Sequence, residues 1–321
     1  MTYRSLYMLM FSAVLLVSAS CKKAEKEKPA SESIAKDAAP PAKEVANDAN
    51  TPIVKEKPEE ATATLLHPFF YKIEGDDDGA MGYLLGTMHM GVDAEKELPS
   101  YVWDIINDTK ILAVEADISD PSLAMGMMLP KDTNLRKEIG EETWKLLEKA
   151  LGEQMANMLM PMKPAAAAAI LAMKDLPKTI PMDMFLLNNA RTREAELSYL
   201  ETGKFQLDLL TKVMTADYLG EILRDPDASD SAKLLQVYRD GDEKALAELM
   251  LDPKAWGSTK KGKANMDMML YSRNRDWIPK LEALFAKKTA LIAVGAAHLI
   301  GINSVVELLK QKGYKVTRIS E

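Results

Sequence analysis

Residues 290–319 carry the strongest fold signal in the chain. Residues 290–294 are a continuous apolar run of strand length, residues 304–312 predict a helix, and residues 314–319 predict a second strand. A strand, a helix and a strand in succession form a β-α-β unit, which predicts that the two strands pair in parallel. Asn303 is the expected N-cap of the helix between them.

The chain before this unit predicts a short sheet and many helices. Residues 69–73 and 81–85 predict a hairpin, and residues 111–114 predict a buried strand. From about residue 121 to residue 290 the pattern is mostly helical. The expected fold class is therefore α/β (α+β), with a small central mixed sheet and a large helical insertion.

The only cysteine of the chain, Cys21, lies where a lipid anchor would be attached. Arg4 supplies a positive charge, residues 6–17 are apolar, and three small residues precede Cys21. This layout is typical of a secretory signal over residues 1–20, and the cysteine resembles the lipidated residue of bacterial lipoproteins. The pattern departs at Ser18, where those proteins usually carry leucine. The alternative is an ordinary cleaved signal followed by an incidental cysteine.

The segment after Cys21 predicts a linker rather than a folded region. Residues 22–64 are rich in Lys, Glu, Ala, Pro and Asp and contain no aromatic residue, so they bury too little apolar surface to fold. The expected organisation is a signal peptide over 1–20, a lipidated linker over 21–64 and one domain over 65–321. We expect a bacterial envelope protein, held by its lipid in the outer membrane and facing the periplasm.

Charge argues against one class of partner. The formal net charge is -7, and the chain contains no basic stripe, so a nucleic-acid partner is not expected. The sequence does not predict an oligomeric state.

Two of the three histidines occur in the same setting, an apolar strand followed by Gly-x-x-His. Gly86 and His89 follow the first strand, and Gly295 and His298 follow the second. Chance would place glycine three residues before two of three histidines only about once in a hundred cases, given the usual frequency of glycine. The predicted strand at 111–114 ends in Glu115. Ligands bind at the carboxyl edge of such sheets, so these side chains should converge.

Two imidazoles and a carboxylate form a good ligand set for a divalent metal. We therefore predict a catalytic metal site of His89, Glu115 and His298, with Zn, Mn and Co all compatible. A bound metal would lower the pKa of its water and polarise a carbonyl group. The glycines allow a tight turn and a close approach of the backbone. The alternative is that both histidines are structural and that Glu115 is part of an ion pair.

At these residues the sequence resembles the TraB/GumN family, which is related to the TIKI proteases and more distantly to erythromycin-esterase and ChaN-like proteins. The resemblance runs from Phe69 to Ile319. The segments that carry it are Phe70–Gly75, Leu84–Gly91, Ala113–Asp117, Met182–Asp183, Leu200–Thr202 with Gln206, Arg273–Asn274 with Trp277, and Val294–Gly301.

The resemblance implies a fold like that of these proteins and a metal-dependent site built on the paired Gly-x-x-His motifs and an acidic residue. In the TIKI branch it implies cleavage of peptide bonds, so the expected activity is hydrolysis of a peptide or small amide substrate. Arg273 and Glu201 are candidates for substrate contact. The alternative is that they form a salt bridge that packs helices together.

Two other functions remain open. A lipid-anchored protein could use the same pocket for binding without turnover. The chain is also rich in methionine, with groups at residues 125–128 and 155–162, and thioethers bind Cu(I) in exported proteins. The alternative for these methionines is an adaptable core or an apolar groove.

Overall fold

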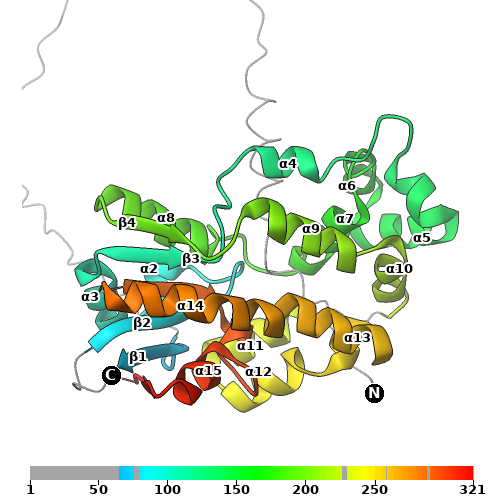
Figure 1. Cartoon of the computed structure of the whole chain (residues 1–321). Coiled ribbons are helices and arrows are strands. Elements are labelled where there is room, and N and C mark those ends of the chain that lie inside the picture. The colour runs from blue at the N-terminus through cyan, green and yellow to red at the C-terminus, as the bar shows by residue number, and fades with distance from the viewer. Residues whose placement is uncertain (1–64, 76–79, 226–229, 258, 288–289, 321) are drawn as a thin grey trace, which may run out of the picture.

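A single mixed sheet organises the protein (Figure 1). The structure is a computed structural model, and it describes residues 65–75, 80–225, 230–257, 259–287 and 290–320. Within these residues the sheet has six strands in the order β4-β3-β5-β2-β1-β6. The strands are β1 (Phe70–Glu74), β2 (Ala80–Thr87), β3 (Ile111–Val114), β4 (Glu196–Tyr199), β5 (Ala290–Gly295) and β6 (Lys315–Arg318).

Strand β5 is the centre of the sheet. It pairs in parallel with β3 on one side and with β2 on the other, and β4 extends the parallel part beyond β3. All six of its residues are buried, as expected for a strand covered on both faces. The predicted hairpin is confirmed, because β1 and β2 pair antiparallel.

The predicted pairing of the last two strands is wrong. Strand β6 pairs antiparallel with β1, and β2 and β1 lie between it and β5. The physical reason lies in its composition, since β6 alternates exposed and half-buried residues while β5 is wholly apolar and buried. A strand whose one face is exposed to solvent suits the antiparallel edge of a sheet, whereas a strand buried on both faces suits its parallel centre.

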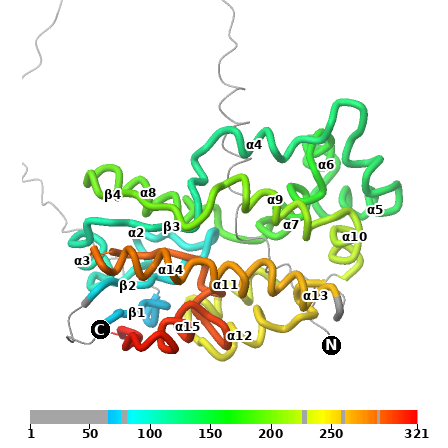
Figure 2. Tube along the Cα trace, viewed as in Figure 1, coloured from blue at the N-terminus to red at the C-terminus, as the bar shows by residue number. Residues whose placement is uncertain are grey.

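Helices cover the sheet and extend away from it on one side. The tube view follows this helical part from β3 to β5 (Figure 2). Their bounds are α2 (Ala94–Glu97), α3 (Ser100–Asp108), α4 (Ser122–Gly126), α5 (Leu135–Leu151), α6 (Glu153–Met158), α7 (Pro164–Met173), α8 (Met182–Thr192), α9 (Gly203–Val213), α10 (Ala216–Arg224), α11 (Ser231–Asp240), α12 (Glu243–Met250), η3 (Pro253–Trp256), α13 (Thr259–Met266), η4 (Asp267–Tyr271), α14 (Ser272–Ala286), η5 (Ala296–His298) and α15 (Val305–Gln311). The mixed sheet and large helical insertion are as predicted.

Two local expectations differ from the structure. Ser304, rather than Asn303, is the N-cap of α15, and its hydroxyl accepts a hydrogen bond from the Glu307 amide. Asn303 instead has a positive φ of 59°, a conformation that asparagine tolerates better than most residues. Strand β4 was not predicted, because its four residues are exposed or half-buried and show no clear alternation.

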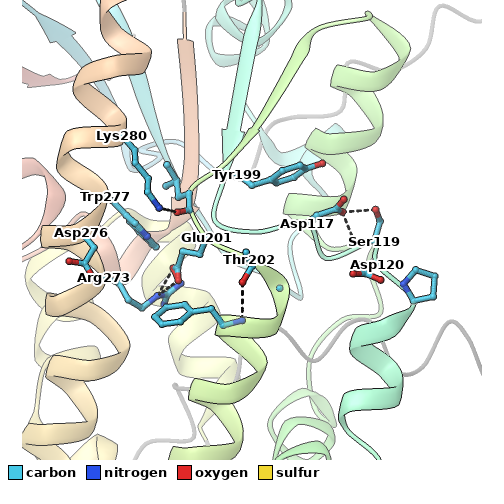
Figure 3. A pocket seen from close by; sticks show the side chains of 14 residues that line it. Asp117, Ser119, Asp120, Tyr199, Glu201, Thr202, Arg273, Asp276, Trp277 and Lys280 are labelled. Atoms are coloured by element: carbon cyan, nitrogen blue, oxygen red, sulfur yellow. Dashed lines mark hydrogen bonds and ion pairs between the residues drawn. The ribbon is translucent and has the colours of Figure 1, made fainter.

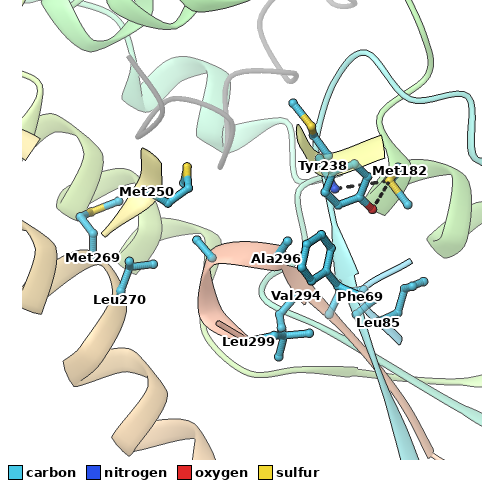
Figure 4. Packing of buried hydrophobic residues seen from close by; sticks show 14 of the residues in the cluster. Phe69, Leu85, Met182, Tyr238, Met250, Met269, Leu270, Val294, Ala296 and Leu299 are labelled. Carbon is cyan, nitrogen blue, oxygen red and sulfur yellow. Dashed lines mark hydrogen bonds between the residues drawn. The ribbon is translucent and has the colours of Figure 1, made fainter. Parts of the chain in front are cut away.

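The core packs directly beneath the turn that follows β2 (Figure 4). Phe69 stacks on Tyr238 with ring centroids 5.7 Å apart. The Tyr238 hydroxyl donates a 2.7 Å hydrogen bond to the carbonyl oxygen of Gly86. The residue before β1, a tyrosine of α11 and the first Gly-x-x-His motif are therefore joined in one buried cluster, which fixes the position of this motif.

The predicted signal peptide, Cys21 and the linker lie outside the described residues. Among the helices of the part that is described, none is both long and apolar enough to cross a membrane.

Gly86→Ala should destabilise the fold. An added Cβ would lie 2.7 Å from Cβ of Phe69 and 3.1 Å from Cα of Ala296, which is closer than packed atoms allow. Overpacking of this kind costs about 1–3 kcal/mol, so the free energy of unfolding in urea should fall by about that amount. An unchanged urea midpoint would mean that this turn does not need a glycine.

Candidate functional site

The three predicted site residues lie at one edge of the sheet. Residues Thr87 and Gly295 are register partners at the ends of β2 and β5, and Val114 at the end of β3 pairs with Ala293. Because these strands are parallel neighbours, the segments that follow them emerge side by side. His89, Glu115 and His298 are all buried there, and His298 has no exposed surface at all.

Glu115 is held on both of its carboxylate oxygens. Its Oε1 accepts a 2.8 Å hydrogen bond from the amide of Gly295, the glycine of the second Gly-x-x-His motif. Its Oε2 accepts hydrogen bonds from Nη2 of Arg273 at 2.6 Å and from Nε2 of Gln206 at 2.9 Å. The carboxylate is therefore fixed by β5, α14 and α9 together.

Arg273 joins the parts of the site. Its guanidinium bonds Glu115 and Glu201, with N–O distances of 2.6 Å to each, and its Nη1 donates to the carbonyl oxygen of Met269. The guanidinium carbon lies 4.8 Å from the ring centre of Trp277, within the range of a cation–π contact. The side chain is 2% exposed, so these partners replace water around a buried charge.

The local backbone explains how Arg273 reaches this position. The π-helical turn η4 runs directly into α14, and Met269, the carbonyl partner of Arg273, lies within that turn. Single π-turns inside helices widen the backbone and occur frequently at functional sites.

His298 is a neutral ring held on both nitrogens. Its Nδ1 is 2.5 Å from Oδ1 of Asn274, whose Nδ2 donates to the carbonyl oxygen of Asn303. This places the amide oxygen toward the ring, so Nδ1 is the donor. Nε2 then accepts from Nη1 of Arg273 at 3.2 Å. Burial lowers the pKa of His298 well below its usual value, and the Arg273 charge lowers it further.

His89 has the opposite electrostatics. Burial acts to lower the pKa of His89, but the charge of Asp183 and its hydrogen bond to Nδ1 outweigh burial, so the pKa is raised. Asp183 is buried at the start of α8 and also accepts a 3.0 Å hydrogen bond from the Thr87 hydroxyl. His89 is therefore the basic imidazole of the site and His298 the neutral one.

The predicted metal-ligand set assembles in part. Both histidines have Nδ1 bonded to a side-chain oxygen, which is the arrangement that orients metal-binding imidazoles through Nε2. Glu115 does not fit a metal in this arrangement, because Arg273, Gln206 and Gly295 hold its oxygens. Accordingly, no group of three acidic, histidine or cysteine side chains within the described residues is arranged around a metal position.

Arg273 and Glu201 connect this buried centre to a large cleft. The cleft has a volume of about 1000 Å³ and lies between the segment after β3, the segment after β4 and the helix α14 (Figure 3). Both residues line it, whereas His89, Glu115 and His298 do not. The two residues predicted to contact substrate thus form the wall between the cleft and the centre, and the salt bridge that was their alternative is also present.

The methionine groups lie away from this centre, on the helical part. Met125, Met128, Met155 and Met158 are among the exposed large apolar side chains, while Met127 is buried in the core. A short bridge pairs Met128 with Met162. Copper binding stays a prediction.

Three residues of the site were not predicted to be part of it. Asp183, Asn274 and Gln206 were noted only as parts of segments that resemble a family, without a role. Their contacts with His89, His298 and Glu115 join residues 94, 24 and 91 positions apart, which no local pattern reveals. Their place inside those segments was the available signal.

A family model decides the relationship. The model of the TraB/PrgY/gumN family matches residues 69–318, nearly the whole described domain. The chain belongs to the TraB/PrgY/gumN family. The match includes both Gly-x-x-His turns, Glu115 and Arg273, so the residues that form the centre lie within the region the family shares.

A curated relative adds a distant likeness. The chain is 32% identical over 171 residues to a protein of Amphimedon queenslandica named "Metalloprotease TIKI homolog". The aligned part is 44% of this chain and 33% of that protein, so the chain spans about a third of the length of its relative. No solved structure matches the chain.

Removal of Arg273 should unfold the centre. Arg273→Met leaves two buried carboxylates, Glu115 and Glu201, without their cation, a change that costs about 3–5 kcal/mol. Arg275→Met is the matched control two residues along α14, because Arg275 forms an exposed ion pair with Asp267 that contributes only about 0–1 kcal/mol. Urea unfolding of both variants measures the difference. Equal losses would show that the buried ion pairs do not stabilise the fold.

The two imidazoles should titrate differently. In NMR spectra His89 should titrate above the ordinary histidine range, and Asp183→Asn should lower its pKa because the paired charge is lost. His298 should stay neutral down to low pH. His→Gln variants assign the signals. Coincident titration of His89 and His298 would contradict the described environments.

Proposed function

We propose that this protein hydrolyses peptide or amide bonds at the centre formed by His89, Glu115 and His298. The observation that carries the proposal is the pair of buried imidazoles at one edge of the sheet, each held through Nδ1 by a side-chain oxygen, from Asp183 for His89 and from Asn274 for His298. Paired imidazoles oriented in this way are typical of the metal sites of hydrolytic enzymes.

The residues of the chain have distinct roles in this proposal. Asp183 holds the ring of His89 through Nδ1, which leaves Nε2 of that ring to face the position of an ion. Arg273 brings positive charge to the place where negative charge develops on the substrate oxygen. Glu115 positions Arg273, and Asn274 fixes the tautomer of His298.

The name of the relative supports a metal-dependent reaction. His89 and His298 are the residues that would hold a divalent ion such as Zn, Mn or Co, because the orientation of both rings fits that role. When bound, such an ion would polarise the scissile carbonyl and activate water. Nη1 of Arg273 lies 3.2 Å from Nε2 of His298, so the guanidinium and a metal compete for this ring.

Substrate reaches the centre from the cleft in this proposal. The centre is buried, and Arg273 and Glu201 are the cleft residues that bond to it. Movement of this pair would open the route. A lipid on Cys21 would tether the domain to the bacterial outer membrane on its periplasmic side, and the linker would give it reach.

The activity test uses all three histidines. We expect His89→Ala and His298→Ala each to reduce hydrolysis of a fluorogenic peptide library by about 100-fold or more, since each variant removes one of the two imidazoles that would hold the ion. His67→Ala is the control, because this histidine is exposed and lies outside the centre. Circular dichroism checks that each variant is folded.

Equal activity of all three variants would contradict the assignment of hydrolysis to this centre. A wild-type protein that binds peptides without cleaving any would instead support the second candidate, a binding protein that uses the same cleft. The complete burial of His298 is the observation that favours this second candidate.

A further inference from the structure

The cleft beside Arg273 is lined by aromatic and by acidic side chains. Its volume of about 1000 Å³ is at the upper end of the range for ligand pockets and accommodates several residues of a peptide. Tyr199, Phe205 and Trp277 give it aromatic surface. Phe205 is 43% exposed, so its ring is accessible to a ligand in the cleft.

Carboxylates stand on opposite sides of the same space. Asp117 and Asp120 lie on the segment after β3, and Asp276 lies across the cleft on α14 (Figure 3). Asp120 and Asp276 are exposed to solvent, and Asp117 is half-buried. The pKa of Asp117 is lowered overall, because hydrogen bonds from Ser119 and the charge of Arg191 outweigh its burial, so it is ionised at neutral pH.

The basic residues around the cleft are engaged by other groups. Lys280 donates its amine to the carbonyl oxygen of Leu200. Arg273 is bonded to Glu115 and Glu201. Arg191, just outside the lining, donates to the Ser119 hydroxyl at 3.0 Å and is 3.9 Å from Asp117. Acidic groups therefore dominate the surface that a ligand would meet.

A single metal ion does not suit this arrangement. The described residues contain no group of three such side chains close enough to share an ion. Carboxylates spread around aromatic faces instead suit an organic cation on a long stem, because ammonium and guanidinium groups bind aromatic faces as well as carboxylates.

We propose that this cleft binds a positively charged group of a peptide, either a lysine or arginine side chain or a free amino terminus. The cationic group lies on the side of Asp117 and Asp120 with its stem against the aromatic side chains, and Asp276 adds negative charge from the opposite side of the cleft. The adjoining backbone is thereby placed beside Arg273, at the entrance to the centre. The choice of bond rests on the proposed hydrolase function, whereas binding of the cation does not.

Binding without turnover tests the proposal. Fluorescence anisotropy measures the affinity of the purified protein for labelled alanine-based peptides that carry one lysine, one norleucine or one glutamate, all with acetylated amino termini. A fourth peptide has a free amino terminus and no lysine. We expect the lysine peptide, the free-terminus peptide, or both to bind about tenfold more tightly than the norleucine peptide, with glutamate weakest. The peptide that binds more tightly identifies whether a side chain or an amino terminus supplies the cation.

Charge variants locate the effect. Asp117→Asn/Asp120→Asn/Asp276→Asn should weaken the cationic peptides about tenfold and leave the norleucine peptide unchanged. Asp104→Asn/Asp132→Asn/Asp217→Asn is the matched control, because it removes the same charge from exposed residues that do not line the cleft. In the wild type, added salt should reduce the preference for cations, and this comparison needs no variant.

The two proposals fail separately. Equal affinity for the lysine, free-terminus and norleucine peptides, or equal losses in the two triple variants, would overturn the cleft proposal. Selective binding of cationic peptides that are never cleaved would leave the cleft proposal standing and overturn the hydrolase.

Discussion

The buried guanidinium of Arg273 is the interaction on which the arrangement of the site depends. One side chain bonds Glu115 from the end of β3, Glu201 from the segment after β4 and His298 from the turn after β5. Breaking such a network leaves buried charges without partners, so its geometry is held more tightly than that of a surface ion pair. Because Arg273 also lines the cleft, the same residue stabilises the buried centre and separates it from the cleft.

The parallel strands of the sheet bring the side chains of the site together. Four parallel strands end at one edge. Each is followed within a few residues by an ionisable side chain, and these side chains are His89, Glu115, Glu201 and His298. The helices then add what the strands cannot, since Asp183 from α8 and Asn274 from α14 set the orientation of the two rings. The strands thus position the ionisable side chains, and the helices supply the partners that orient the two rings.

The sequence predicted the parts that depend on local patterns. Apolar strands followed by Gly-x-x-His located His89 and His298, because a buried strand and a turn glycine leave a clear local signal. It did not predict β4, whose four residues are short and partly exposed, nor the insertion of β2 and β1 between β5 and β6. It could not predict that Arg273 donates to Oε2 of Glu115, since that contact joins residues 158 positions apart and depends on how α14 docks.

The proposed function requires that the two histidine turns form one centre that binds a divalent metal. Elemental analysis by mass spectrometry of the purified protein, after incubation with Zn, Mn or Co and removal of excess ion, tests it most directly. We expect about one ion per chain in the wild type and in His67→Ala, and loss of that ion in both His89→Ala and His298→Ala. A wild-type protein that retains no ion, or variants that retain it unchanged, would show that the two turns do not form a metal site.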